Sequence, residues 1–197
     1  LILKIKKYLE WFIRYRDPKR TGLISILHPW ESGYDNSPLW DNPMSKIKID
    51  TKLSYKRKDN KIVEKNQRPL KIDYDRYVTI KNHLRKNKYN PKHLYNKSMF
   101  NVVDVGFNSI FLRANKDLLV LLKIFNFEHK KLQKFILKSE NQIEKLYNEK
   151  KGVFTNYDIR NKKKIIVPSI TNYFILFADL KNQTINKKII KNLKNHN

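Results

Sequence analysis

Apolar side chains recur at helical spacing through most of this chain, and this periodicity restricts it to a fold of packed helices. The widest stripe lies in residues 103–125 and comprises Phe107, Ile110, Phe111, Ala114, Leu118, Leu121, Leu122 and Phe125. The same spacing predicts further helices at 1–15, 73–86, 129–147, 169–180 and 185–194. Strands and helices do not alternate as a parallel sheet requires. We therefore expect an all-α fold, with room for one short β-hairpin in residues 153–168.

A helical bundle, a solenoid and an α/α toroid all fit this order of helices, and the pattern does not choose between them. Residues 18–72 are expected as a long loop region, in which the charged stretch 46–68 makes a surface excursion. The 197 residues are enough for one domain with its own core. Because the chain starts without Met, in what reads as the middle of a helix, we expect a piece of a longer protein.

Lys and Arg are absent from three segments of a chain that is otherwise rich in them. They number 43 against 18 Asp and Glu, yet residues 21–45, 98–112 and 165–180 contain neither. Such segments should be buried, or should line a site where a cation would be harmful. The last two are typical of core segments. The first is rich in polar and turn-forming residues, which favours a site.

The net charge of +25 raises nucleic acid as a possible partner. However, the residues that dominate the chain are those of A/T-rich codons, and no nucleic-acid-binding motif is found. We therefore favour compositional drift and expect no nucleic-acid partner. The lack of Cys excludes disulfides and thiolate metal sites and fits a cytoplasmic location. No apolar run reaches transmembrane length, so no membrane partner is expected, and neither a cofactor nor a metal.

Three carboxylates stand among aromatic residues in HPWESGYDNSPLWD, residues 28–41. An acid in such surroundings suits glycoside cleavage, because the leaving oxygen needs a proton and apolar neighbours raise a carboxyl pKa. Aromatic faces also stack on sugar rings. The candidates are Glu31, Asp35 and Asp41. From the pattern alone, each could equally be a turn or cap residue.

The same segment closely resembles the HPWESG-x-DNSP-x-WD signature of (α/α)6-barrel hydrolases of the mannosylglycerate and glucosylglycerate hydrolase type, which are similar to glycoside hydrolase family 63. The resemblance continues in order through RDPKRTGL (16–23), DYDRY (73–77), FNVVDVGFNSIFLRANKDL (100–118) and YDIRNKKKIIVPSI (157–170). It is weakest at 42–67. It implies a partial (α/α)6 barrel, in which residues 1–197 are the central part of a single catalytic domain truncated at both ends.

The resemblance assigns the general acid to Asp35 and implies an inverting reaction on a small α-glucosyl or α-mannosyl compound, such as a glycosylglycerate. In inverting enzymes a second carboxylate activates water, and the two carboxyls stand roughly 6.5–9.5 Å apart. In the family this base is a Glu in the C-terminal part, beyond the position of residue 197. We therefore expect the chain alone to lack it. Glu140, Glu144 and Glu149 are expected at the surface.

Five further residues are candidates for substrate binding. Arg68 and Tyr74 match positions that contact substrate in the glycerate-linked hydrolases, and Arg68 could hold a glycerate carboxylate or be one more surface Arg. Trp30 and Tyr34 could wall the sugar subsite, or each could serve simple packing, which is favoured for Trp30. Glu31 could bind a sugar hydroxyl or hold the loop.

Four other positions are expected to support the site or to modify it. His28 is expected as a structural hydrogen-bond partner, and Asp104 and Asn108, on one helix face, as support behind the site. Asp104 could instead serve only the helix N-terminus. Leu39 stands where the family usually has Arg, a change that could shift specificity or be a neutral surface change.

Two other functions remain open at this point: a degenerate, non-catalytic barrel remnant and a basic nucleic-acid-binding helical protein. A downstream Glu in the complete reading frame would favour the enzyme over the remnant. Lys side chains spread evenly over the surface, with a neutral or acidic face around Asp35, would exclude the nucleic-acid-binding protein.

Overall fold

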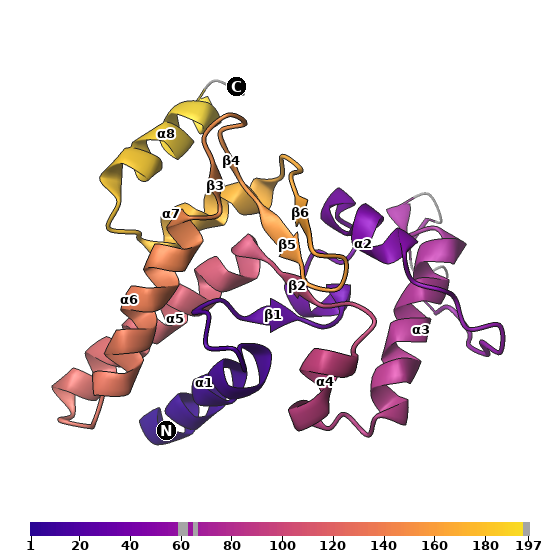
Figure 1. Cartoon of the computed structure of the whole chain (residues 1–197), viewed down its shortest axis with the longest axis horizontal. Coiled ribbons are helices and arrows are strands. Elements are labelled where there is room, and N and C mark those ends of the chain that lie inside the picture. Colours follow the sequence, from indigo (N-terminus) through magenta and orange to yellow (C-terminus); the bar gives the residue numbers. More distant parts are fainter. Residues whose placement is uncertain (59–62, 65–66, 195–197) are drawn as a thin grey trace.

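A computed structural model describes residues 1–58, 63–64 and 67–194 of the chain. Helices dominate, and a small sheet lies between the group of α1, α5 and α6 and the group of α3 and α4 (Figure 1). The long helices are α1 (Ile2–Arg16), α3 (Lys71–Lys86), α5 (Val105–Ile124), α6 (Lys130–Glu144) and α8 (Gln183–Lys194). The short helical elements are η1 (Pro29–Ser32), η2 (Pro38–Trp40), α2 (Asp41–Ser45), α4 (Pro91–Lys97), η5 (Ile170–Tyr173) and α7 (Phe174–Ala178).

The expected long helices are confirmed to within a few residues, whereas α2 and α4 were not predicted. Helix α4 carries a start signal that the apolar pattern does not show, because Pro91 occupies its first position. Asn90 caps it by accepting a hydrogen bond from the backbone N–H of Lys92 at 3.1 Å. With seven residues, α4 is too short to form a recognisable stripe.

The all-α prediction is too narrow, because a four-stranded antiparallel sheet joins distant parts of the chain. Its order is β1 (Ser25–Ile26), β2 (Val102–Val103), β5 (Asn156–Asp158) and β6 (Lys163–Ile165). The expected hairpin in 153–168 is the pair β5 and β6. A second sheet pairs β3 (Tyr147–Asn148) with β4 (Val153–Phe154). Strands of two residues are too short to show an alternating pattern.

Helix α5 lies at the centre of the larger apolar cluster and packs against α1, α6 and α7. Its predicted stripe is only partly covered. Phe111, Leu118 and Leu122 are buried, whereas Ile110 and Phe125 are exposed in the described chain. A second apolar cluster surrounds residues 26–47 and packs them against α3 and α4. The site segment thus rests on a core of its own.

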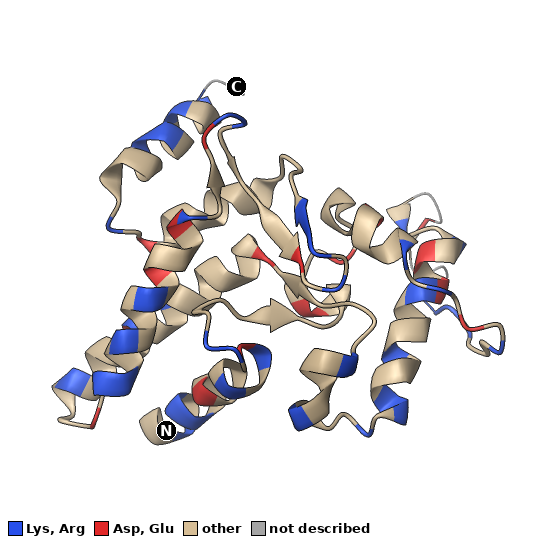
Figure 2. Cartoon of the chain, in the orientation of Figure 1, with Lys and Arg blue, Asp and Glu red and all other residues tan. Residues whose placement is uncertain are grey.

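Burial explains the segments without Lys and Arg only in part, because most of residues 165–180, which were expected as a core segment, are exposed or half-buried. Residues 24–29 and 100–106 are buried throughout. Basic residues are instead spread over α1, α3, α6 and α8, as Figure 2 shows. Within the described residues, no helix is long and apolar enough to cross a membrane. The same part of the chain holds no cluster of three His, Cys, Asp or Glu side chains suited to a metal ion.

Glu140 is not at the surface, which corrects the expectation for this residue. Its side chain is 4% exposed and pairs with Lys116 of α5 at 2.7 Å. Nζ of Lys116 also donates to the carbonyl oxygen of Ala178 at 3.0 Å, so one ammonium group joins α5, α6 and the end of α7. Glu144 is half-buried and Glu149 is exposed.

Replacing Lys116 by Ala should lower the free energy of unfolding by about 2–4 kcal/mol, because it leaves a carboxylate buried without its partner. Urea denaturation measures the change. Arg113→Ala is the matched control on the same helix, because its ion pair with Asp117 is exposed and should contribute less than about 0.5 kcal/mol. Equal effects of the two substitutions would contradict a structural role for the buried pair.

Candidate active site

The segment 28–41 folds as two short 3-10 turns because its sequence supplies a cap and a proline for each. His28 Nδ1 accepts a hydrogen bond from the N–H of Trp30 at 3.0 Å, and Pro29 occupies the first position of η1. Ser37 and Pro38 do the same for η2. Gly33 ends η1 with a φ of 80°, a left-handed conformation that favours glycine.

Tyr34 connects this segment to the beginning of α5. Its hydroxyl donates to Oδ2 of Asp104, which also caps α5 by accepting from the N–H of Phe107 at 2.8 Å. The Tyr34 ring stacks on Trp40 with centroids 5.8 Å apart. Burial, together with the Asp104 carboxylate, raises the pKa of the Tyr34 hydroxyl far above its usual value, so it stays protonated. Of its two predicted roles, the structure gives Tyr34 extensive packing.

Asp104 and Asn108 lie behind the segment, on the face of α5 where they were expected. Burial raises the pKa of Asp104, and the hydrogen bonds from Tyr34 and the backbone oppose this shift. Asn108 Oδ1 accepts from the N–H of Ile24 at 2.9 Å, and its Nδ2 donates to the Ile24 carbonyl at 2.8 Å. These bonds fix the strand that leads into the site segment.

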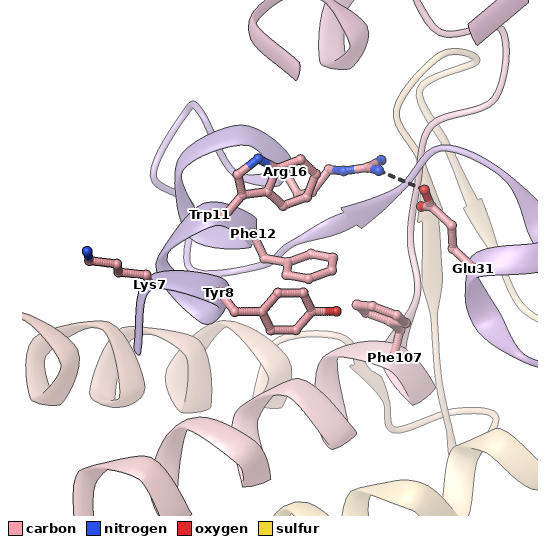
Figure 3. A pocket seen from close by; sticks show the side chains of 7 residues that line it. All are labelled: Lys7, Tyr8, Trp11, Phe12, Arg16, Glu31 and Phe107. Atoms are coloured by element: carbon pink, nitrogen blue, oxygen red, sulfur yellow. Dashed lines mark hydrogen bonds and ion pairs between the residues drawn. The ribbon is translucent and has the colours of Figure 1, made fainter. Parts of the chain in front are cut away.

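Both oxygens of Glu31 are occupied by neighbours within the chain. Arg16 donates to Oε1 at 2.7 Å, and the N–H of Leu27 donates to Oε2 at 2.8 Å. Glu31 therefore holds the loop, which was one of its two predicted roles. With Arg16 it borders an open hollow of about 700 Å³ in front of three aromatic rings, those of Tyr8, Phe12 and Phe107 (Figure 3). Asp35 does not line this hollow.

Asp35 is half-buried, and its backbone carbonyl accepts a hydrogen bond from the hydroxyl of Tyr77 in α3 at 2.7 Å. The charged groups around the Tyr77 hydroxyl shift its pKa. Burial first, and then the negative charges of Asp35, Asp73 and Asp41, raise the pKa of its hydroxyl, while Arg68 opposes the shift. Asp35 and Arg68, far apart in the sequence, therefore lie within electrostatic reach of the same hydroxyl.

Aromatic rings are grouped around Tyr77, whose hydroxyl binds the Asp35 carbonyl. Trp30 is 41% exposed, and its ring lies 4.3 Å from that of His28 and 6.3 Å, edge-on, from that of Tyr74. Trp30 thus packs against its neighbours and is also partly exposed, and its role at a sugar subsite stays a prediction. Tyr74 in turn stacks on Tyr55 at 5.4 Å, and the guanidinium of Arg57 lies 4.3 Å from its centroid.

Tyr55 and Arg57 were missed by the sequence analysis. They belong to the stretch 46–68, which is charged, weakly patterned and outside the recognised motifs. No local signal marks them, because their contacts with Tyr74 arise only when this stretch folds back on α3.

Leu39 is buried in the apolar cluster around the site segment, at 2% exposure. The interpretation of this position as a neutral surface change is therefore wrong. A guanidinium confined here would be expensive to desolvate. The apolar residue fits the packing of this chain.

These features define a class of protein. A carboxylate in a segment rich in aromatic residues, on a helical scaffold, suits a glycoside hydrolase, because the reaction needs a proton donor and aromatic rings can stack on a sugar. The family model for the mannosylglycerate hydrolase MGH1-like glycoside hydrolase domain matches residues 2–197. The chain belongs to this family.

Individual relatives agree with this assignment. A mannosylglycerate hydrolase of Thermus thermophilus is 39% identical over 183 residues, which are 93% of this chain and 44% of that protein. The crystal structure of a GH63 mannosylglycerate hydrolase from Thermus thermophilus in complex with Tris superposes with a TM-score of 0.94 at 37% identity, covering 97% of this chain and 46% of that one. The structure of that enzyme with Tris and D-glycerate gives 0.89 at 37% identity, over 92% of this chain and 44% of that one. The chain thus spans less than half the length of these relatives.

His28 should make stability depend on pH. Burial lowers its pKa from 6.5 to about 4, because a buried imidazolium would be poorly solvated. The unfolded chain takes up a proton below pH 6.5 and the folded chain only near pH 4. Stability from this residue is therefore complete above pH 6.5 and decreases as the pH falls towards 4, by on the order of 3 kcal/mol in total.

Unfolding free energies of the wild type and of His28→Asn, measured between about pH 7.5 and pH 4, test this prediction. The variant should be less stable at neutral pH but should lose less stability on acidification, so that the two curves converge. Parallel curves would show that His28 contributes no pH dependence.

Gly106→Ala should detach the site segment from α5. A Cβ at this position would lie 2.5 Å from the Tyr34 hydroxyl and 3.1 Å from Cβ of Thr171, so the Tyr34 side chain has to move. We expect a loss of about 1–3 kcal/mol in unfolding free energy, measured by thermal melting. Gly33→Ala is the control, because nothing lies within 4 Å of its added Cβ and only the strain of its positive φ remains. A smaller loss for Gly106→Ala than for Gly33→Ala would contradict the close contact.

Proposed function

We propose that the protein carrying this chain is an inverting glycoside hydrolase of small α-mannosyl or α-glucosyl compounds, above all glycosylglycerates. Asp35 is its general acid. The observation that carries the proposal is the position of Asp35, in the DNSP part of the family signature, where its carbonyl is bound by Tyr77, whose ring lies 5.8 Å from that of the partly exposed Trp30. The scaffold is an (α/α)6 barrel, and residues 1–197 form the central part of a single catalytic domain.

In the proposed reaction, Asp35 gives its proton to the glycosidic oxygen while the bond from the anomeric carbon to that oxygen breaks. A water molecule on the opposite face loses a proton to a Glu and forms the new bond to carbon, which inverts the configuration. This Glu is expected in sequence that corresponds to the relatives' remaining length. Glu140 is not a candidate, since it is buried against Lys116 in the C-terminal half of α5, away from Asp104 at the helix start.

Substrate contacts follow from the groups around Asp35. The open part of the Trp30 ring and the Tyr74 ring suit stacking on a sugar. Arg68 supplies a positive charge near Asp35, suited to a glycerate carboxylate. D-glycerate in the Thermus enzyme structure supports this class of substrate. A cytoplasmic location and the lack of any cofactor stay predictions.

A non-catalytic remnant of the barrel is the second candidate, because Asp35 supplies only one of the two carboxylates that the inverting reaction needs. The nucleic-acid-binding alternative is not supported, since basic residues are spread over several helices and loops (Figure 2).

Asp35→Asn in the complete enzyme should lower kcat by about 10²- to 10⁴-fold for substrates with poor leaving groups, because the leaving oxygen loses its proton donor. Release of sugar from mannosylglycerate and glucosylglycerate measures the rate. Asp117→Asn is the control, since this carboxylate is exposed on α5, where it pairs with Arg113. An unchanged rate in Asp35→Asn would remove Asp35 from the acid role.

The 197-residue chain by itself should not hydrolyse glycosides, because we expect the general-base Glu in the part of the relatives' length that this chain does not cover. Turnover by this chain that Asp35→Asn abolishes would contradict the expected position of the base. No turnover by the complete protein would favour the remnant.

A further inference from the structure

Tyr77 of α3 is hydrogen-bonded to the segment 28–41 at two points, His28 and Asp35. Nε2 of His28 lies 3.0 Å from the Tyr77 carbonyl oxygen. Nδ1 of His28 accepts from the N–H of Trp30, so the proton of the neutral ring is on Nε2 and is donated to Tyr77. At the second point, the side-chain hydroxyl of Tyr77 donates to the backbone carbonyl of Asp35 at 2.7 Å.

The hydroxyl of Tyr77 is a fixed donor. Its side chain belongs to a residue that is 3% exposed, and its ring packs against those of His28 and Trp30, with centroids 5.9 and 5.8 Å away. Burial and the surrounding carboxylates raise its pKa, so it remains protonated over the working pH range. The packing therefore holds the hydroxyl in place, and the raised pKa keeps it a hydrogen-bond donor.

The two peptide planes on either side of the Asp35 Cα are held from different directions. The carbonyl of Tyr34 accepts from Nε1 of Trp40 at 3.0 Å and from the N–H of Ser37 at 3.2 Å. The carbonyl of Asp35 accepts from Tyr77. Because each peptide unit is planar, fixing both carbonyl groups fixes φ and ψ of Asp35. The direction of its Cα–Cβ bond follows from them, and this direction restricts the positions that the carboxyl group can reach through rotation about χ1 and χ2.

We propose that Tyr77 is a positioning residue for the general acid: its hydroxyl sets the orientation of Asp35 without touching substrate. This inference rests on the proposed function of Asp35. It assigns a role to a Tyr that neither binds sugar nor exchanges protons in the reaction. Since correct placement of a catalytic group within about 1 Å can be worth roughly a hundredfold in rate, losing one hydroxyl should be measurable.

The test compares Tyr77→Phe, Asp35→Asn and the wild type in the complete enzyme on two substrates with the same sugar. One is the glycosylglycerate, whose leaving group needs a proton, and the other is the glycosyl fluoride, whose leaving group needs little protonation. Tyr77→Phe should lower kcat about 10- to 100-fold on the first and less than about threefold on the second, with KM nearly unchanged. Tyr95→Phe removes a hydroxyl from another buried Tyr, in α4, and should match the wild type on both.

Three results would overturn the inference while leaving the proposed function intact, provided that Asp35→Asn is impaired on the glycosylglycerate. These are a wild-type rate in Tyr77→Phe, an equal loss on both substrates, and a change confined to KM. If Asp35→Asn keeps the full rate, the proposed function itself fails, and the inference fails with it. Replacing Tyr77 by 3-fluorotyrosine retains the donor and should retain the rate, which guards against a general effect of altering this site.

A second readout does not depend on turnover. In Tyr77→Phe, amide hydrogen exchange in residues 28–37 should accelerate by about tenfold, the effect of one lost hydrogen bond. Exchange in the middle of α5 should not change. Unaltered protection of residues 28–37 would contradict the inference even if the variant proved inactive.

Discussion

The hydrogen bond between the half-buried Tyr34 and the buried Asp104 is the contact on which the arrangement of the site depends. Asp104 also caps α5, and the N–H of Val105 beside it donates to Asn156 of β5 at 2.9 Å. One short stretch at the start of α5 thus connects the site segment, the central helix and the sheet. With α3 on the other side, through Tyr77, the segment that carries Asp35 is held between two helices.

This dependence explains why a strongly basic chain keeps Lys and Arg out of residues 21–45 and 98–112. Both segments meet at the Tyr34–Asp104 contact, and both contribute buried side chains to the two apolar clusters. A long cation here would have to be desolvated without a partner, which costs several kcal/mol. At exposed positions on the helices a Lys side chain stays in water, so its accumulation through compositional drift carries no desolvation cost.

Local patterns predicted what local forces determine. Apolar stripes predicted the long helices that the structure shows. The Trp- and Pro-rich segment with its family signature predicted Asp35, Trp30 and Tyr34 as site residues. What escaped prediction depends on contacts between distant residues. Strands β1 and β2 are two residues long and exist through pairing, Glu140 is buried through Lys116, and Tyr55 and Arg57 reach Tyr74 by folding back on α3. Tyr77 could be assigned to a helix but not to a partner, because its hydroxyl meets a backbone atom 42 positions away.

The most direct test of the account is a crystal structure of the complete Asp35→Asn enzyme with intact mannosylglycerate bound. The account predicts that the side chain at position 35 lies within hydrogen-bond distance of the glycosidic oxygen, with Trp30 against the sugar and Arg68 towards the glycerate. A Glu from the remaining sequence should stand on the opposite face of the anomeric carbon. Substrate bound elsewhere, with position 35 far from the glycosidic oxygen, would contradict the account.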